Sequence, residues 1–170
     1  MSTKEENELS ALLPTWYVYN VKFVCGIQRN KITESCEAAG PSPGSAILSQ
    51  GIYSTEVNIF NYHTRAEARI LKYFAPLVLE NKPVGFEPKQ QPAKLFDRIV
   101  LRPNSATGDD CCGVTKHLKV KNLLNIGFLK IVSSVDLSVT AVYTVADIDN
   151  RVVSMDVEQI TAKMDAMFQF

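Results

Sequence analysis

The stretch Val135-Asp-Leu-Ser-Val-Thr-Ala-Val-Tyr-Thr-Val145 shows the alternation that decides the fold class. Every second residue is apolar, and four of the five residues between them are polar. Side chains alternate between two faces along a β-strand, so the pattern predicts a half-buried strand over 135–145. β-branched and aromatic residues, which dominate the stretch, are also typical of strands. A shift of pairing by one residue would bury Asp136, Ser138 and Thr140, so the register is strongly specified.

Similar patterns predict six further strands. In the first of them Gly26 is expected to end the strand, and in the last Val153, Met155 and Val157 are expected to face the core. Pro76 has no N–H, so its strand is expected at a sheet edge or with a bulge. Alternation and turn residues place the six strands at 16–25, 52–62, 68–79, 95–101, 126–132 and 152–160.

These elements predict one all-β domain. Short strands separated by turn residues, without strand–helix–strand alternation, favour a two-sheet antiparallel sandwich of the immunoglobulin-like or jelly-roll type. We expect an N-terminal arm over 1–14, the sandwich over 15–160 and a C-terminal arm over 161–170. Short helices are expected over 3–13 and 114–124, the first of them from a capping-box pattern.

The composition limits the partners and the location. The 170 residues include 18 basic and 18 acidic side chains, so the net charge is zero. Non-specific nucleic-acid binding depends on clustered Lys and Arg, so no nucleic-acid partner is expected. No run of 18 apolar residues occurs, so no membrane span is expected. Residues 1–14 lack a signal-peptide pattern, which predicts a cytoplasmic location, with extracellular or cell-surface assembly as the alternative.

Five short fragments form a pattern that extends over residues 16–160. The pattern resembles a set of uncharacterised bacterial β-sandwich proteins, and this resemblance implies the fold but no activity. A looser likeness is to spore appendage subunits, which are jelly-roll proteins joined by terminal arms and by disulfides between subunits. The fragments are Lys22-Phe-Val-Cys-Gly26, Gly51-Ile-Tyr-Ser-Thr-Glu-Val-Asn-Ile59, Asp110-Cys111, Gly127-Phe-Leu129 and Ala141-Val-Tyr-Thr144.

The four cysteines are candidates for disulfides or for metal ligands. They lack Cys-x-x-Cys spacing, and adjacent cysteines rarely bind one metal ion, so buried thiols are favoured over a zinc site completed by His63 and His117. Disulfides are expected if the protein leaves the cell, and an outward-facing cysteine could link subunits. The sequence leaves the pairing open among Cys25, Cys36, Cys111 and Cys112.

Catalytic chemistry finds little support in the sequence, and no catalytic residue, metal or cofactor is predicted. A nucleophilic Cys111 or Cys112 would need a nearby cation, whereas the adjacent Asp109 and Asp110 would raise the thiol pKa. Phosphate-binding glycine loops are absent. Glu56 and Asp97 could meet as a glycosidase pair, but they are equally consistent with surface charges.

A ligand-binding module is the second hypothesis. The aromatic residues at strand ends, together with the long loop 27–50, could bind carbohydrate. Packing in the core is the favoured alternative, because most of them fall on inward faces, with Tyr62 and His63 as the exposed exception. The aromatic residues considered are Trp16, Tyr17, Tyr19, Tyr53, Tyr62, Tyr73 and Tyr143.

Apolar residues near both ends of the chain support the leading hypothesis. Exposed apolar patches often mark interaction sites, and extended arms can add a strand to a neighbouring sheet. We therefore predict a non-enzymatic structural protein that self-assembles into a homo-oligomer or filament through terminal arms and sheet edges. The alternative is that both tails fold back on their own domain. The candidate assembly residues are Leu9, Leu12, Leu13, Trp16, Met167, Phe168 and Phe170.

Overall fold

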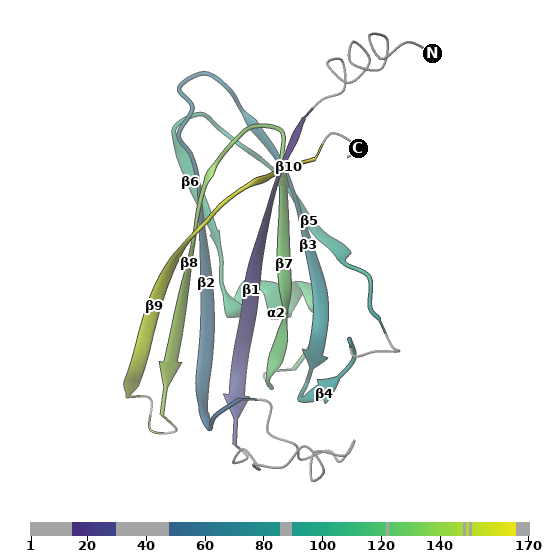
Figure 1. Cartoon of the computed structure of the whole chain (residues 1–170), viewed down its shortest axis with the longest axis vertical. Coiled ribbons are helices and arrows are strands. Elements are labelled where there is room, and N and C mark those ends of the chain that lie inside the picture. Colours follow the sequence, from purple (N-terminus) through teal and green to yellow (C-terminus); the bar gives the residue numbers. More distant parts are fainter. Residues whose placement is uncertain are drawn as a thin grey trace, which may run out of the picture.

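The structure is a computed structural model, and it describes residues 15–29, 48–85, 90–121, 123–147, 149 and 151–165. Within these ranges antiparallel β-strands dominate, and the single described helix lies beside them (Figure 1). The all-β antiparallel class predicted from the sequence is therefore confirmed. In chain order the elements are β1 (Trp16–Gln28), β2 (Gly51–Asn61), β3 (Ala68–Leu79), β4 (Lys82–Pro83), β5 (Lys94–Leu101), β6 (Ser105–Asp109), α2 (Cys111–Leu118), β7 (Asn125–Ser133), β8 (Ser138–Ala146), β9 (Val152–Ile160) and β10 (Lys163–Asp165).

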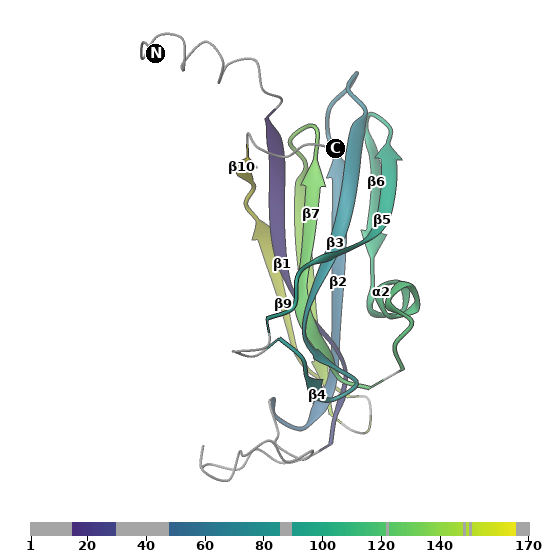
Figure 2. The same cartoon turned by 90° about the vertical axis from the view of Figure 1, so that its right-hand side faces the viewer.

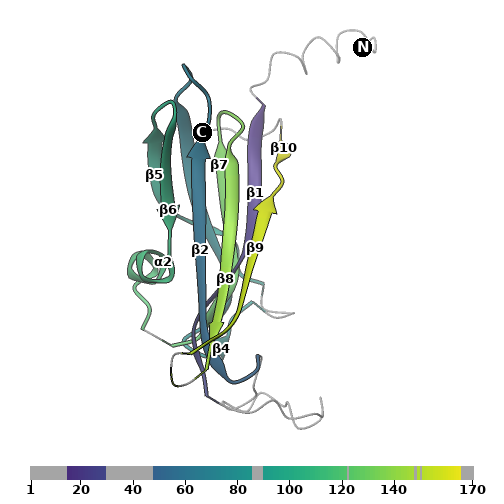
Figure 3. The same ribbon diagram turned by 90° about the vertical axis from the view of Figure 1, so that its left-hand side faces the viewer.

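Hydrogen bonds connect the described strands into one ten-stranded sheet. Its main path runs β4-β3-β7-β1-β2-β8-β9, while β5, β6 and β10 pair with β3, β2 and β1 respectively. Figure 1 shows this path from β3 on the right to β9 on the left. The turned views place α2, β5 and β6 on one side of the molecule and β9 and β10 on the other (Figure 2 and Figure 3).

The sheet has two halves, one with β3, β4, β5 and β7 and the other with β2, β6, β8 and β9. Strand β1 pairs with both halves, and its pairing partner changes at Gly26. The strand pairs with β7 from Tyr17 to Cys25 and with β2 from Gly26 to Gln28. Gly26 has a φ of +116°, and a Cβ there would overlap the carbonyl group of Leu123. Only glycine tolerates both conditions. The prediction that Gly26 ends the strand is therefore wrong, because this glycine redirects the strand to a new partner.

Near this change of partner, the backbone groups of Val24 in β1 are hydrogen-bonded by a side chain of β2. The Thr55 hydroxyl accepts a hydrogen bond from the Val24 N–H and donates one to the Val24 carbonyl, both at 3.0 Å. Thr55 is fully buried, so this polar contact lies inside the fold. Buried backbone groups need such partners, and the threonine supplies them where no strand does.

Side chains from both halves of the sheet pack into one core. The inward residues of β8, Val139 and Ala141, are 0% exposed, as their alternation predicts. They meet Tyr19 and Val21 of β1 together with residues of β2, β3, β5, β7 and β9. A smaller cluster extends the core toward α2 and contains Phe23, Cys25, Phe74 and Val114.

The prediction for the faces of β9 is wrong. Val153, Met155 and Val157, which were expected to face the core, are 69%, 67% and 57% exposed. The ladder with β8 sets their direction, because it pairs the buried Ala141 with Glu158. Partners in a ladder share a face, so Ser154, Asp156 and Glu158 lie on the inward side of β9 and Met155 and Val157 point outward. Both faces of β9 are exposed, because each residue from Val152 to Gln159 is exposed.

Pro76 lies at a bulge in β3, as predicted. The ladder between β3 and β7 shifts register between Pro76 and Val78. On the other side of β3, pairing with β5 ends at Phe74 and pairing with β4 begins at Val78. The missing N–H of Pro76 therefore falls in the gap between two partners, and β3 itself is an interior strand.

The described helix begins three residues earlier than the predicted range of 114–124. Asp110 caps it, because a carboxylate oxygen of Asp110 accepts the Gly113 N–H at 2.6 Å. Lys119 ends it in the left-handed conformation, with a φ of +56°. The predicted helix over 3–13 and residues 30–47 of the predicted loop lie outside the described residues.

Candidate functional site

A disulfide joins two of the four cysteines. Cys25 of β1 and Cys111 of α2 are bonded, with 5.6 Å between their Cα atoms. The link attaches the start of α2 to the point where β1 changes partner. Cys112 is a free and exposed thiol. Cys36 lies outside the described residues.

The histidines considered as zinc ligands lie in two different environments. The Nε2 atom of His63 is 2.9 Å from the Asp136 carbonyl oxygen, whereas the His117 ring lies 5.5 Å from the Phe96 ring. The structure does not bring them together with the cysteines. Among the described residues, no group of three or more His, Cys, Asp and Glu side chains could hold a metal ion.

Asp136 is the centre of a hydrogen-bonded cluster with aromatic residues. Tyr19 donates to one carboxylate oxygen at 2.6 Å and Tyr62 donates to the other at 2.7 Å. Burial alone would raise the pKa of Asp136, but these bonds and the Leu137 N–H lower it overall. Burial and the bond to Asp136 raise the pKa of Tyr19. Tyr62 is 45% exposed and stacks on His63 at 4.5 Å, so this pair is the exposed aromatic exception that the sequence indicated.

A buried lysine connects the two halves of the sheet. The Lys72 side chain of β3 is 3% exposed, and its Nζ lies 3.3 Å from Asp97 Oδ2 of β5. The same Nζ lies 3.0 Å from both carboxylate oxygens of Asp109, at the end of β6. Because β5 pairs with β3 and β6 pairs with β2, this ion triad links strands from both halves of the sheet.

A polar cavity of about 620 Å³ opens beside the ion triad. Glu56 and Asp97, the carboxylates considered for glycoside hydrolysis, both lie in its wall. Asp97 is already paired with Lys72, so the two carboxylates have different environments. The wall comprises Glu56, Lys72, Asp97, Ile99, Thr107, Gly108, Asp109, Asp110, Gly113 and His117.

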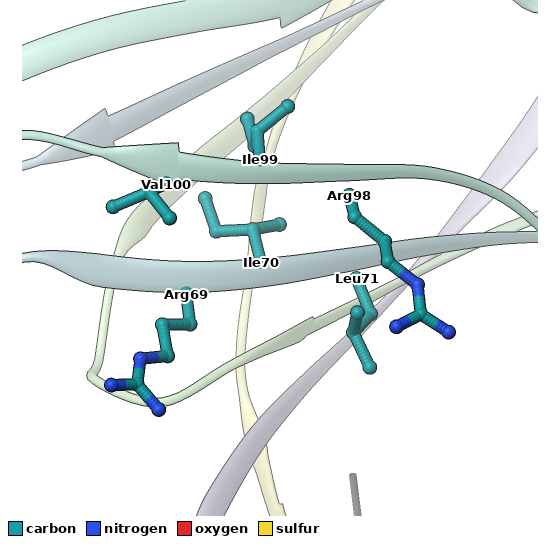
Figure 4. Close-up of a pocket in the computed structure, with 6 residues that line it drawn as sticks. All are labelled: Arg69, Ile70, Leu71, Arg98, Ile99 and Val100. Carbon is teal, nitrogen blue, oxygen red and sulfur yellow. The ribbon is translucent and has the colours of Figure 1, made fainter.

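A smaller groove of about 180 Å³ lies between β3 and β5. Arg69 and Arg98 extend at its two ends, with Val100 beside Arg69 and Leu71 beside Arg98 as their cross-strand neighbours (Figure 4). Val100 is 60% exposed, whereas Leu71 is 4% exposed. The groove is therefore a shallow surface feature with basic ends.

Of the predicted assembly residues, the structure describes Trp16 alone. Trp16 is 7% exposed and pairs in register with Asp165 of β10. It packs with Val18, Leu71 and Val132, so it belongs to the folded domain. The other candidates lie outside the described residues, namely Leu9, Leu12, Leu13, Met167, Phe168 and Phe170.

The exposure of the apolar side chains of β9 is the feature that sequence reasoning missed. This nine-residue strand pairs with β8 alone, and no other described strand with a single partner is as long. Its exposed apolar side chains are Val152, Val153, Met155 and Val157, which are 57–69% exposed. We call the unpaired side of Val152–Ile160 the β9 edge. The sequence carried no signal for it, because Asp156 and Glu158 alternating with these residues is also the pattern of a strand whose apolar face is covered.

Comparison of the chain with protein-family models, curated proteins and solved structures finds no match. Within the described parts of the chain, no helix has the length and apolar character needed to cross a membrane.

Proposed function

We propose that this protein is a non-enzymatic structural subunit that self-assembles through its β9 edge. The observation that carries the proposal is the exposure of Val153, Met155 and Val157 on a nine-residue strand with one partner. An edge strand presents unpaired N–H and C=O groups, which are a template for another strand. Exposed apolar side chains on the same strand add a surface that association would bury.

Two further properties support self-association. The zero net charge of the chain removes the long-range repulsion that keeps many proteins apart. Val157 pairs with Val142 of β8, and both lie on the outer face, so the apolar surface continues from β9 onto β8. Association through such an edge can build either a homo-oligomer or a filament. We propose the arms over 1–14 and 161–170 as further contacts.

We also infer that the two halves of the sheet form a two-layer sandwich. The shared core, to which β1, β3, β5 and β7 contribute on one side and β2, β8 and β9 on the other, supports this arrangement. A layered arrangement explains why inward faces alternate with outer ones in both halves. It leaves β9 at the margin of one layer, where a further strand can be added.

The oligomeric state tests the proposed function. We expect the wild-type protein to exceed the mass of one chain in size-exclusion chromatography with light scattering at micromolar concentration. Met155→Lys should shift the equilibrium toward the monomer, because it places a charge on the contact surface. Asn58→Lys is the matched control, since Asn58 is exposed on the same outer face but lies on the interior strand β2. A wild-type protein that stays monomeric would contradict the proposal.

The polar cavity favours a second candidate function, a module that binds a small polar ligand such as a carbohydrate. Its wall combines carboxylates with the hydroxyl group of Thr107, which can exchange hydrogen bonds with sugar hydroxyls. A glycan array probed with the wild-type protein and with Glu56→Gln tests this function. Binding that the substitution abolishes would support it, and an array without any bound glycan would count against it.

A further inference from the structure

We infer that the β9 edge pairs with the β9 edge of a second copy, antiparallel and about a two-fold axis centred on Met155. The inference rests on the proposed self-assembly and specifies its geometry. In this register Met155 lies opposite the second copy's Met155, Val153 lies opposite Val157, and Ser154 lies opposite Asp156. Counted along the strand, this register spans residues 152–158.

Continuity of the outer faces restricts the available registers. A two-fold axis perpendicular to the sheet keeps the outer face of one copy beside the outer face of the other. Opposed residues must then both be odd-numbered or both even-numbered, because neighbouring side chains alternate faces. The apolar Met155 and Val157 lie on the outer face, so such a pairing brings apolar side chains together across the new contact.

Carboxylates on the inner face exclude the neighbouring registers. A pairing centred on residue 156 would place Asp156 opposite its own copy, and one centred on residue 157 would place Asp156 opposite Glu158. A pairing centred on residue 158 would oppose two copies of Glu158. Like charges directly opposite each other destabilise a strand pair. Centring on Met155 instead places Asp156 opposite Ser154, and it sets no carboxylate opposite Glu158.

Registers displaced further leave a shorter paired segment. Centring on residue 154 opposes no carboxylates, but it pairs only 152–156 within the strand. Centring on residue 159 confines the pairing to the end of the strand, where Ile160 is buried in the core at 8% exposure. The register centred on Met155 is therefore the longest of those that avoid opposed carboxylates.

The backbone of β9 agrees with this register. The Val157 N–H is accepted by the Asp156 carboxylate at 2.9 Å, which indicates that this N–H points away from β8. Backbone groups two residues apart point the same way along a strand, so those of Met155 also face the unpaired side. Opposed Met155 residues can then exchange two hydrogen bonds, as in the hydrogen-bonded pairs of an antiparallel ladder.

A bulge bounds the pairing at one end. Ser154 pairs with Val145 and Val152 pairs with Ala146, so Val153 is an extra residue in the ladder with β8. Bulges disturb pairing and limit edge-to-edge contacts. The regular part of the new contact is therefore the three residues from Ser154 to Asp156, with Val153 and Val157 packing at its ends.

The symmetry has a consequence for the kind of assembly. A contact in which the same patch serves on both subunits is closed, because each β9 edge is consumed by one partner. The β9 edge alone should therefore produce a dimer with a sheet continuous across the axis. A head-to-tail contact, in which β9 paired with a different edge such as β5, would instead extend without closing.

Cysteine cross-linking tests this geometry in a background with Cys36→Ser and Cys112→Ser, which keeps the disulfide between Cys25 and Cys111. Met155→Cys should form a covalent dimer under mild oxidation, because opposed residues lie about 5.5 Å apart at Cα, within disulfide range. Val157→Cys is the matched control. It should not cross-link to itself, because its copy would lie about 13 Å away along the strand.

The outcomes separate this inference from the proposed function. A Met155→Cys dimer without a Val157→Cys dimer supports the two-fold register. A dimer of Val157→Cys alone, or one formed only when the two variants are mixed, overturns it in favour of another register. Wild-type oligomers that Met155→Lys dissociates, with no cross-link at either position, also overturn it but leave self-assembly intact. A wild-type protein that is monomeric throughout removes both.

Discussion

Strands β8 and β9 are hydrogen-bonded neighbours of nine residues each, and both alternate in polarity, yet their surroundings differ. In β8 the residues Val139 and Ala141 are 0% exposed. In β9 the residues Met155 and Val157 are 67% and 57% exposed. The comparison shows that alternation predicts a strand, whereas the position of that strand in the sheet decides which face is covered.

Register explains why the apolar residues Met155 and Val157 lie on the outer face of β9. Tyr143 pairs with Asp156 and Ala141 pairs with Glu158, so these carboxylates share the inward side with β8 residues yet remain exposed. The Tyr143 hydroxyl donates to Glu158 at 3.3 Å, which gives one of these carboxylates a partner. Strand β8 therefore contributes its apolar residues to the core, whereas β9 keeps apolar residues that its own domain does not bury.

The largest expected effect on the free energy of unfolding comes from comparing a valine-to-lysine substitution on β8 with one on β9. Val139→Lys should cost more than about 4 kcal/mol or prevent folding, because it buries an unpaired charge in the core. Val157→Lys should change the free energy of unfolding by less than about 0.5 kcal/mol, since this position is a surface site. Urea denaturation at equal, low protein concentration measures both. Similar losses in the two variants would show that β9 is packed like β8.

The ion triad extends the comparison to polar side chains. Lys72→Met should lower the free energy of unfolding by about 3–5 kcal/mol, because it leaves the carboxylates of Asp97 and Asp109 without their cation. Glu158→Gln on the exposed strand β9 should change it by less than about 0.5 kcal/mol. Urea denaturation at neutral pH provides both values.

A triple variant separates the buried charge from the packing of Lys72. Lys72→Met combined with Asp97→Asn and Asp109→Asn removes every charge of the triad, so much of the lost stability should return. If the triple variant is as unstable as the sum of its single substitutions, then the triad does not act as a unit.

The smallest effect concerns Tyr143 of β8, whose hydroxyl donates to Glu158 of β9. Burial, followed by the charge of Glu158, raises the pKa of Tyr143 from its ordinary value of 10.0 to about 12. Between these pH values the unfolded chain loses the proton while the folded protein keeps it, so stability falls as the pH rises. Tyr143→Phe should reduce this loss when urea midpoints at pH 9 and pH 12 are compared. An unchanged loss would assign the alkaline sensitivity to other tyrosines.

Much of the strand pattern could be predicted because it depends on local sequence. The ranges predicted for β3 and β9 agree with the structure at both ends, and the bulge at Pro76 follows from the missing N–H of proline. The start of α2 could also have been read from Asp110, which is a typical N-cap residue.

The remaining features depend on residues that are distant in sequence. Lys72 reads as a solvated lysine, and its partners Asp97 and Asp109 are 25 and 37 residues further along the chain (97 − 72 and 109 − 72). Gly26 reads as a terminator until the carbonyl of Leu123 is placed against it. The candidate contact on β9 was missed for the same reason, because its inward face follows from the register with β8.

The shared strand β1 has a consequence for synthesis of the protein. Cys25 pairs with Asn125, so one hundred residues (125 − 25) must be translated between the two halves of this contact. At 5–20 residues per second, that interval lasts roughly 5–20 s. During it the sequence Trp-Tyr-Val-Tyr at the start of β1 has left the ribosome without the neighbour that will cover it. Exposed apolar segments and unpaired strand edges favour aggregation, so this interval is the one in which the start of β1 is most exposed to it.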